Sequence, residues 1–365
     1  MTVNFDPDGE EVPLPRETSD LLGHEHAETA LLNGFNSGRL AHAWLITGPR
    51  GIGKATLAYR FARFILANSS NIGGGPSLFG DAPPAPTSLN ISPDNPIFHR
   101  VAGGGHSDLL GIERTRDQKT NKLRTVIRVE EVRQVGGFFG LTASEGGWRV
   151  VVIDAADEMN VNAANAVLKV LEEPPDRALL LLVSHNPGRL LPTIRSRCRV
   201  LRLNPLADPV VEDLIARYHP ELSMDDRSDL VRLSDGSIGH ALALADGAGV
   251  ELYRDMINLI EALPSLDTEA VHKLGDKVAR VGSEQKFQTL GNLLRWWLGR
   301  LVVGGAGKGG QTELMKHVFA QAGLDNWLEV WEKVNRILER TDAVNLDRKQ
   351  TILNIFLTLE RTVRT

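Results

Sequence analysis

The stretch Arg149 to Cys198 reads RVVVIDAADEMN, then VNAANAVLKVLEEPP, then DRALLLLVSHNPGRLLPTIRSRC. It begins with a β-branched run that ends at Asp154, a pattern typical of a strand buried on both faces of a parallel sheet. Apolar residues at helical spacing follow from Asn165 to Leu171, and Pro174-Pro175 ends that helix. A second apolar run, Leu179 to Val183, predicts another buried strand. Strand, helix and strand with short connections predict a βαβ unit.

The composition is that of a globular protein of two or three domains. Its 365 residues are 42% hydrophobic and 24% charged, with a formal net charge of −5. This charge argues against nucleic-acid binding by bulk charge alone, although it is compatible with a local basic face. No apolar run reaches the ~18 residues of a membrane span, and the acidic start is unlike a signal peptide. Because Cys198 is the only cysteine, the sequence excludes an intrachain disulfide and a cysteine-rich zinc site and favours a cytoplasmic location.

A glycine-rich loop lies between a short apolar run, Ala43 to Thr47, and an amphipathic segment, Leu57 to Ala67. A G-x-x-x-x-G-K loop between a strand and a helix directs backbone N–H groups and the lysine toward a phosphate. The sequence therefore predicts a P-loop that binds ATP or ADP, with a simple helix-opening turn as the alternative. The candidate binding residues are Gly48, Gly51, Gly53, Lys54, Thr56 and the strand acid Asp154.

Two groups that ATP hydrolysis needs are missing. The residue after the P-loop lysine should carry a hydroxyl for magnesium, but it is Ala55. Thr56 lies about 100° further around the helix and is poorly placed to replace it. Asp154 stands where a strand-end acid helps to hold magnesium, but Ala155 follows it in place of a water-orienting glutamate. We therefore expect weak or absent nucleotide binding, no metal site and no independent catalysis.

Three arginines, at positions 195, 197 and 199, follow the second buried strand. A solvated charged face is the default interpretation of such a run. Because the run lies just past the sheet, one of these arginines could instead reach a nucleotide on a neighbouring subunit. An arginine finger supplied in trans accelerates phosphoryl transfer by about 10³–10⁵. The residues alone leave both interpretations open.

The P-loop, Asp154, the run Asn165 to Lys169, LEEPP at 171–175 and SRC at 196–198, in this order and spacing, resemble the bacterial clamp-loader AAA+ subunits of DNA polymerase III. The resemblance covers Leu21 to about Ala245 well and the C-terminal third only in general character. It implies an α/β AAA+ P-loop domain with a parallel sheet flanked by helices. A small helical lid and an all-α C-terminal collar domain, which forms the oligomer, should follow.

The resemblance also implies a role within that family. Active gamma/tau-type subunits carry a hydroxyl, a glutamate and a lid arginine where this chain has Ala55, Ala155 and Gly239, whereas Arg197 of the SRC motif is kept. This pattern implies a subunit that has lost its own hydrolysis and supplies Arg197 in trans to a gamma/tau neighbour. The implied partners are gamma/tau and delta subunits, with the sliding clamp and primed DNA reached through the assembled complex and no membrane. The four zinc cysteines usual in the family are missing.

We expect four regions along the chain: a flexible tail (1–19), the AAA+ domain (20–204), the lid (205–247) and the collar (248–365). A Gly/Pro-rich surface insertion, at about 68–107, takes the place of the zinc module. Gly136-Gly137 should break the helix that begins at Glu130, and Asp157 and Glu158 should begin the helix of the βαβ unit.

Two other functions stay open. An active AAA+ motor, such as a gamma/tau-like ATPase or a helicase loader, would hydrolyse ATP as an isolated chain. A stand-alone P-loop kinase or nucleotide-binding switch would not associate with clamp-loader subunits, and it leaves the LEEPP and SRC motifs unexplained.

Overall fold

The structure is a computed structural model that describes residues 13–68, 84–117, 123–144, 147–306, 312–344 and 346–364. The chain forms two compact units, residues 1–221 with 231–241 and residues 222–230 with 242–365. The predicted lid, residues 205–247, is therefore divided between the two units. Within the described ranges, no helix has the length and apolar character needed to cross a bilayer.

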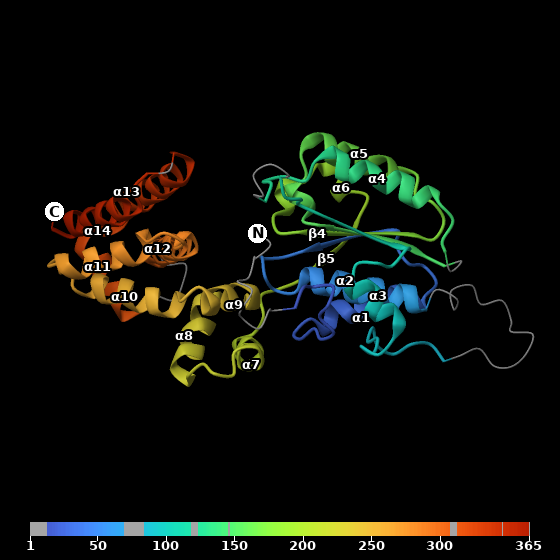
Figure 1. Cartoon of the computed structure of the whole chain (residues 1–365), viewed down its shortest axis with the longest axis horizontal. Coiled ribbons are helices and arrows are strands. Elements are labelled where there is room, and N and C mark those ends of the chain that lie inside the picture. Colours follow the sequence, from blue (N-terminus) through green and yellow to red (C-terminus); the bar gives the residue numbers. More distant parts are fainter. Residues whose placement is uncertain are drawn as a thin grey trace, which may run out of the picture. The chain divides into compact units, whose positions relative to one another are not determined.

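The first unit is built on a five-stranded parallel sheet with the strand order β2-β3-β4-β1-β5 (Figure 1). The register places Thr47 beside Ser184 and Asp154 beside Val183. Because the strands are parallel, their carboxyl ends share one edge of the sheet, which is the edge where the P-loop begins. The strands are β1 (Ala43–Thr47), β2 (Leu109–Glu113), β3 (Arg149–Asp154), β4 (Ala178–Ser184) and β5 (Arg199–Arg202). The predicted α/β fold with a parallel sheet is confirmed.

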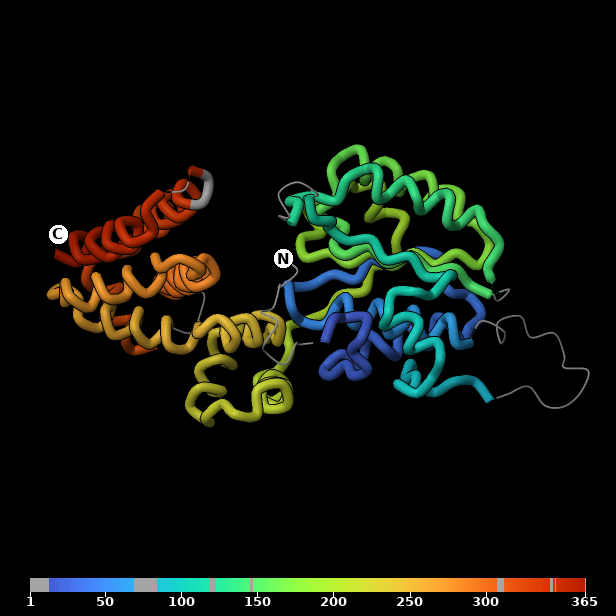
Figure 2. Tube along the Cα trace, viewed as in Figure 1, coloured from blue at the N-terminus to red at the C-terminus, as the bar shows by residue number. Residues whose placement is uncertain are grey.

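Helices cover both faces of this sheet (Figures 1 and 2). On one face lie α1 (Glu25–Asn36), α2 (Lys54–Ala67) and α3 (Pro96–Ala102), and on the other α4 (Val129–Gly140), α5 (Val161–Glu172) and α6 (Pro192–Arg195). Alternate residues of β3 enter the two layers: Val150 and Val152 pack toward α2, whereas Val151 and Ile153 pack toward α4 and α5. Burial on both faces explains why the central strands are apolar without alternation.

The C-terminal part of the chain is entirely helical in the residues described. It comprises α7 (Asp208–Tyr218), α8 (Met224–Ser234), α9 (Ile238–Asp246), α10 (Gly249–Glu261), α11 (Thr268–Ala279), α12 (Glu284–Gly305), α13 (Glu313–Val344) and α14 (Arg348–Arg364). In the second unit α12 packs on α13, and α14 packs on both α11 and α13. Trp297, Trp327 and Phe356 are buried there. The predicted helical lid segments and all-α C-terminal region are thus present.

Two segments that we expected to lie outside the core, residues 13–19 and the second half of 68–107, make contacts with it. Arg63 of α2 is only 1% exposed and donates to the carbonyl oxygens of Arg16 (2.8 Å) and Thr18 (2.6 Å). Residues 13–19 are therefore held in place, while residues 1–12 of the predicted tail lie outside the described residues.

The predicted surface insertion at 68–107 is wrong for its second half, and its residues 69–83 lie outside the described residues. Helix α3 lies within this interval and packs on α2. Val101 is buried, and the ring of Phe98 lies 4.5 Å from the guanidinium of Arg63. The short apolar pattern of α3 was hidden by the Gly/Pro-rich composition around it.

Two local predictions around the βαβ unit are also wrong. Helix α4 continues through Gly136 and Gly137, because Val132, Val135 and Phe139 bury one face and outweigh the low helix propensity of glycine. Asp157 and Glu158 do not begin α5. They lie in a separate 3₁₀ turn, Ala156–Glu158, and the side chain of Asn160 caps α5 by accepting from an N–H at 2.8 Å.

Candidate functional site

The P-loop follows β1 directly and leads into α2 at Lys54. Gly51 and Gly53 have φ angles of +70° and +96°, which favour glycine. A Cβ atom on Gly48 would lie 2.5 Å from the carbonyl oxygen of Leu203, so this position also excludes a side chain. The loop therefore has the glycine-dependent curl that the motif predicts. Thr56 is half-buried on α2, and its hydroxyl makes no hydrogen bond with another described residue.

The two charged groups of the predicted nucleotide site lie close enough to influence each other. Lys54 is buried, and its Nζ donates to the carbonyl oxygen of Pro49 within its own loop. Burial lowers the pKa of Lys54 to about 8, although Asp154 and Asp157 oppose this shift. Burial raises the pKa of Asp154 to about 6, although the positive charge of Lys54 opposes it. The structure thus brings the P-loop lysine and the strand acid together, as the sequence predicted.

Gly239, which stands where the family's lid arginine is expected, lies directly on the P-loop. The N–H of Gly239 donates to the carbonyl oxygen of Gly51 at 2.8 Å. A Cβ atom on Gly239 would lie 2.9 Å from the Cα of Gly51, which leaves no room for an arginine side chain at this position. Ala55 and Ala155 supply neither a hydroxyl for magnesium nor a carboxylate to orient water.

The sequence interpretation missed the residues that fix this edge of the sheet. Glu158, whose side chain is 12% exposed, pairs with Arg50 of the P-loop and lies 2.7 Å from Nε of Arg114. Asp157 accepts from the N–H of His185 (2.9 Å) and from that of the next residue (3.1 Å). Burial, with the nearby charges of the P-loop, lowers the pKa of His185 to about 3. No local pattern reveals these contacts, because each joins residues far apart in the chain.

The three arginines after β4 have different environments. Arg199 lies over the ring of Trp44, with its guanidinium carbon 4.8 Å from the ring centre. Arg197 is 36% exposed, and its Nη2 lies 3.0 Å from Oε1 of Glu172, the last residue of α5. Arg195 is exposed, and its side chain pairs with no other described residue. Of the three, Arg197 alone is both solvent-accessible and held by a charged partner within the described chain.

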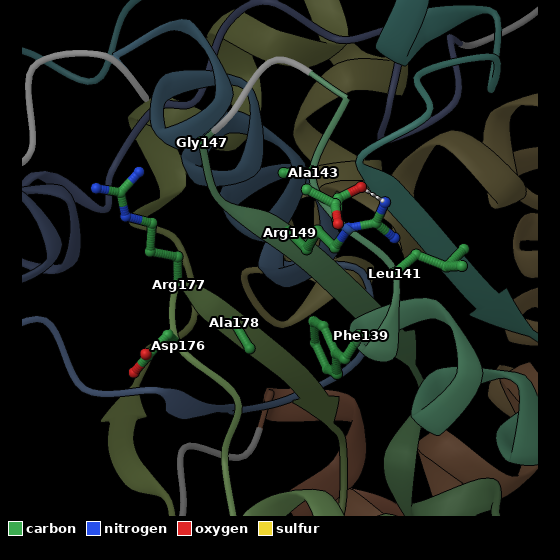
Figure 3. A pocket seen from close by; sticks show the side chains of 9 residues that line it. Phe139, Leu141, Ala143, Gly147, Arg149, Asp176, Arg177 and Ala178 are labelled. Atoms are coloured by element: carbon green, nitrogen blue, oxygen red, sulfur yellow. Dashed lines mark hydrogen bonds between the residues drawn. The ribbon is translucent and has the colours of Figure 1, made fainter.

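A separate hollow of about 230 Å³ lies near the amino ends of β3 and β4 (Figure 3). Its central side chain, Arg149, is buried and donates to the carbonyl oxygens of Phe138 and Thr142. Arg149 also lies 3.5 Å from Asp108, whereas Arg177 points away from it in Figure 3. Through these contacts, Arg149 holds the start of β3 against the segment that follows α4. Among the described residues, no group of three or more His, Cys, Asp or Glu side chains could hold a metal ion.

Comparisons with known proteins find similarity to subunits of DNA polymerase III. A family described as "DNA polymerase III, delta subunit" matches residues 92–207. The delta' subunit of DNA polymerase III from Pseudomonas aeruginosa is 38% identical over 218 residues, which are 60% of this chain and 59% of the relative. The tau subunit from Escherichia coli is 30% identical over 64% of this chain and 33% of its own length. The matches therefore span less than two thirds of these relatives.

A solved gamma subunit-related protein from Thermotoga maritima aligns with 92% of this chain and 100% of its own, at 17% identity and a TM-score of 0.38. The sequence matches, not this alignment, support the relationship. They confirm the resemblance that the P-loop, LEEPP and SRC motifs indicated. The chain is similar in sequence to the delta-prime and gamma/tau subunits of DNA polymerase III.

Proposed function

We propose that the chain is a clamp-loader subunit of the delta-prime type. It supplies Arg197 in trans to the ATP of a gamma/tau-type neighbour and does not hydrolyse ATP at its own P-loop. With gamma/tau and delta subunits, in the cytoplasm, it would help to load a sliding clamp onto primed DNA. The observation that carries this proposal is the contrast between Lys54, which is bonded to its own loop, and Arg197, which is exposed and oriented.

The contacts of the P-loop support a subunit without independent catalysis. Gly239 occupies the position of the lid arginine and packs on Gly51, while Ala55 provides no magnesium ligand. An active AAA+ motor needs these groups at its own site, so this function is the weaker candidate. A stand-alone P-loop enzyme is weaker still, because it does not account for the match to a delta' subunit.

The trans role is tested in a complex reconstituted with gamma/tau and delta subunits and supplied with clamp and primed DNA. We expect Arg197→Ala to assemble normally but to slow hydrolysis at the adjacent ATP site by up to about 10³-fold. Pre-steady-state hydrolysis would show this as the loss of one part of the rapid burst. Arg195→Ala removes an equal charge two residues away and should behave as wild type. Full activity of the Arg197→Ala complex would contradict the proposal.

The inactivity of its own site is tested on the isolated chain. We expect no ATP turnover above background, and no difference between wild type and Lys54→Ala. Turnover that disappears in Lys54→Ala would instead identify an active motor.

A further inference from the structure

We infer that Glu172 is a positioning residue for Arg197, an inference that rests on the proposed trans role of Arg197. Glu172 belongs to the LEEPP motif and Arg197 to the SRC motif, which lie far apart in the sequence. The packing of α5 against α6 brings them together, with Oε1 of Glu172 3.0 Å from Nη2 of Arg197. The ion pair therefore joins the two most specific motifs of the chain.

The contacts of Arg197 engage both terminal nitrogens of the guanidinium, and the side chain stays partly exposed. Nη1 donates to the carbonyl oxygen of Thr193 at 3.1 Å, and Nη2 faces Glu172. Nε has no hydrogen-bond partner among the described residues, and the side chain is 36% exposed. Since arginine presents five N–H donors in one plane, Nε–H and the terminal N–H groups that Thr193 and Glu172 do not engage are left to contact phosphoryl oxygens. Glu172 thus restrains the direction of the group through Nη2 without engaging Nε.

The backbone on both sides of this pair is fixed by the core. Leu171 directly precedes Glu172, Cys198 directly follows Arg197, and Ile194 lies three residues before it; Leu171, Ile194 and Cys198 are buried in the same hydrophobic cluster. The remaining conformational freedom is that of the Arg197 and Glu172 side chains, and the ion pair between them restricts it. A half-exposed ion pair is a weak restraint, so removing Glu172 should lower the population of the oriented arginine about two- to fivefold.

The effect on the reaction is measured in the reconstituted complex described above. Glu172→Ala should lower the rate at the Arg197-dependent site about two- to fivefold and leave the half-saturating ATP concentration unchanged. Glu172→Gln keeps an oxygen acceptor and should recover part of the loss. Glu173→Ala removes the neighbouring exposed carboxylate, which pairs with no described residue, and should behave as wild type.

The dependence on Arg197 is tested by combining the variants. In the Arg197→Ala background, Glu172→Ala should have no further effect, because the group that it orients is gone. A rate for Glu172→Ala equal to that of wild type would overturn the positioning role. A higher rate would also overturn it, because Glu172 would then restrain Arg197 rather than direct it.

Side-chain NMR on the isolated full chain separates this inference from the proposed function. Nitrogen relaxation of the Arg197 Nε–H group should show restricted motion in wild type and in Glu173→Ala, but greater motion in Glu172→Ala. Equal mobility in all three overturns the positioning role, whatever Arg197 does in the complex. If Arg197 is restricted only when Glu172 is present and Arg197→Ala still keeps full activity, then the trans role fails and the orienting contact stands.

Discussion

The two edges of the first unit that carry the family motifs differ in how deeply their charged groups are buried. At the P-loop, Lys54 is buried and bonded to its own loop, and Gly239 lies on Gly51. Beyond α5, Arg197 and Glu172 form an ion pair in which the side chains are 36% and 50% exposed. Buried polar groups require partners, whereas an exposed pair contributes about 0–1 kcal/mol. The charged group at the first edge is therefore enclosed by the fold, whereas that at the second edge is partly accessible to solvent.

Under the proposed function, this difference means that one domain keeps half of a shared catalytic site. An ATP site built between subunits needs a P-loop from one chain and an arginine from the next. The chain keeps the loop backbone but closes it with its own contacts, while its arginine stays accessible. Substitutions at the P-loop edge should thus change stability, and substitutions at the arginine edge should change the behaviour of a complex.

Asp154→Asn tests the buried charge at the P-loop edge. The pKa of Asp154 is raised from 3.8 to about 6, mainly by burial, so the folded state binds this proton more tightly than the unfolded state. Its contribution to stability is present below about pH 4 and is lost as the pH rises to about 6. At pH 7, Asp154→Asn should therefore stabilise the first unit by about 1–3 kcal/mol, with no gain at pH 4. Native-state hydrogen exchange of the β3 and β4 amides measures this.

Asp157 provides a control of opposite sign. Burial raises its pKa, but the hydrogen bond from the N–H of His185 helps to outweigh this and to hold the pKa below the ordinary value. The ionised form is therefore favoured in the fold, and its contribution is lost as the pH falls through the folded pKa. Asp157→Asn should destabilise the unit at pH 7 by about 1–2 kcal/mol, less so in acid. Parallel pH profiles for the two variants would refute the difference between these acids.

Gly239→Ala tests the closed contact between the lid motif and the P-loop. The added Cβ would lie 2.9 Å from Gly51, against backbone that cannot rotate away. We expect a loss of about 1–3 kcal/mol in the exchange free energies of the first unit. Gly137→Ala on α4 is the matched substitution, because its Cβ would meet nothing within 4 Å. That variant should gain about 0.5–1 kcal/mol, since glycine is a poor helix residue. A gain in both variants would mean that the contact does not persist in solution.

The sequence predicted those elements whose pattern is local. β1, β3 and β4 are runs buried on both faces, and the P-loop is a contiguous motif, so each could be recognised by itself. β2 was missed because it is an edge strand, in which Ile112 alone is buried. The pairing of Arg197 with Glu172 was missed for a different reason. It depends on how α5 packs against α6, and the periodicity within either segment does not predict that contact.

The smallest expected effect on stability is that of Arg197→Ala. An ion pair exposed to this extent contributes about 0–1 kcal/mol, so the exchange free energies of the first unit should hardly change. Arg63→Met is the contrasting substitution, because it leaves the carbonyl oxygens of Arg16 and Thr18 without their buried donor. That variant should lose about 2–3 kcal/mol. If Arg197→Ala destabilised the unit as much as Arg63→Met, then Arg197 would belong to the fold, and the distinction between an inward-facing P-loop edge and an accessible arginine edge would be lost.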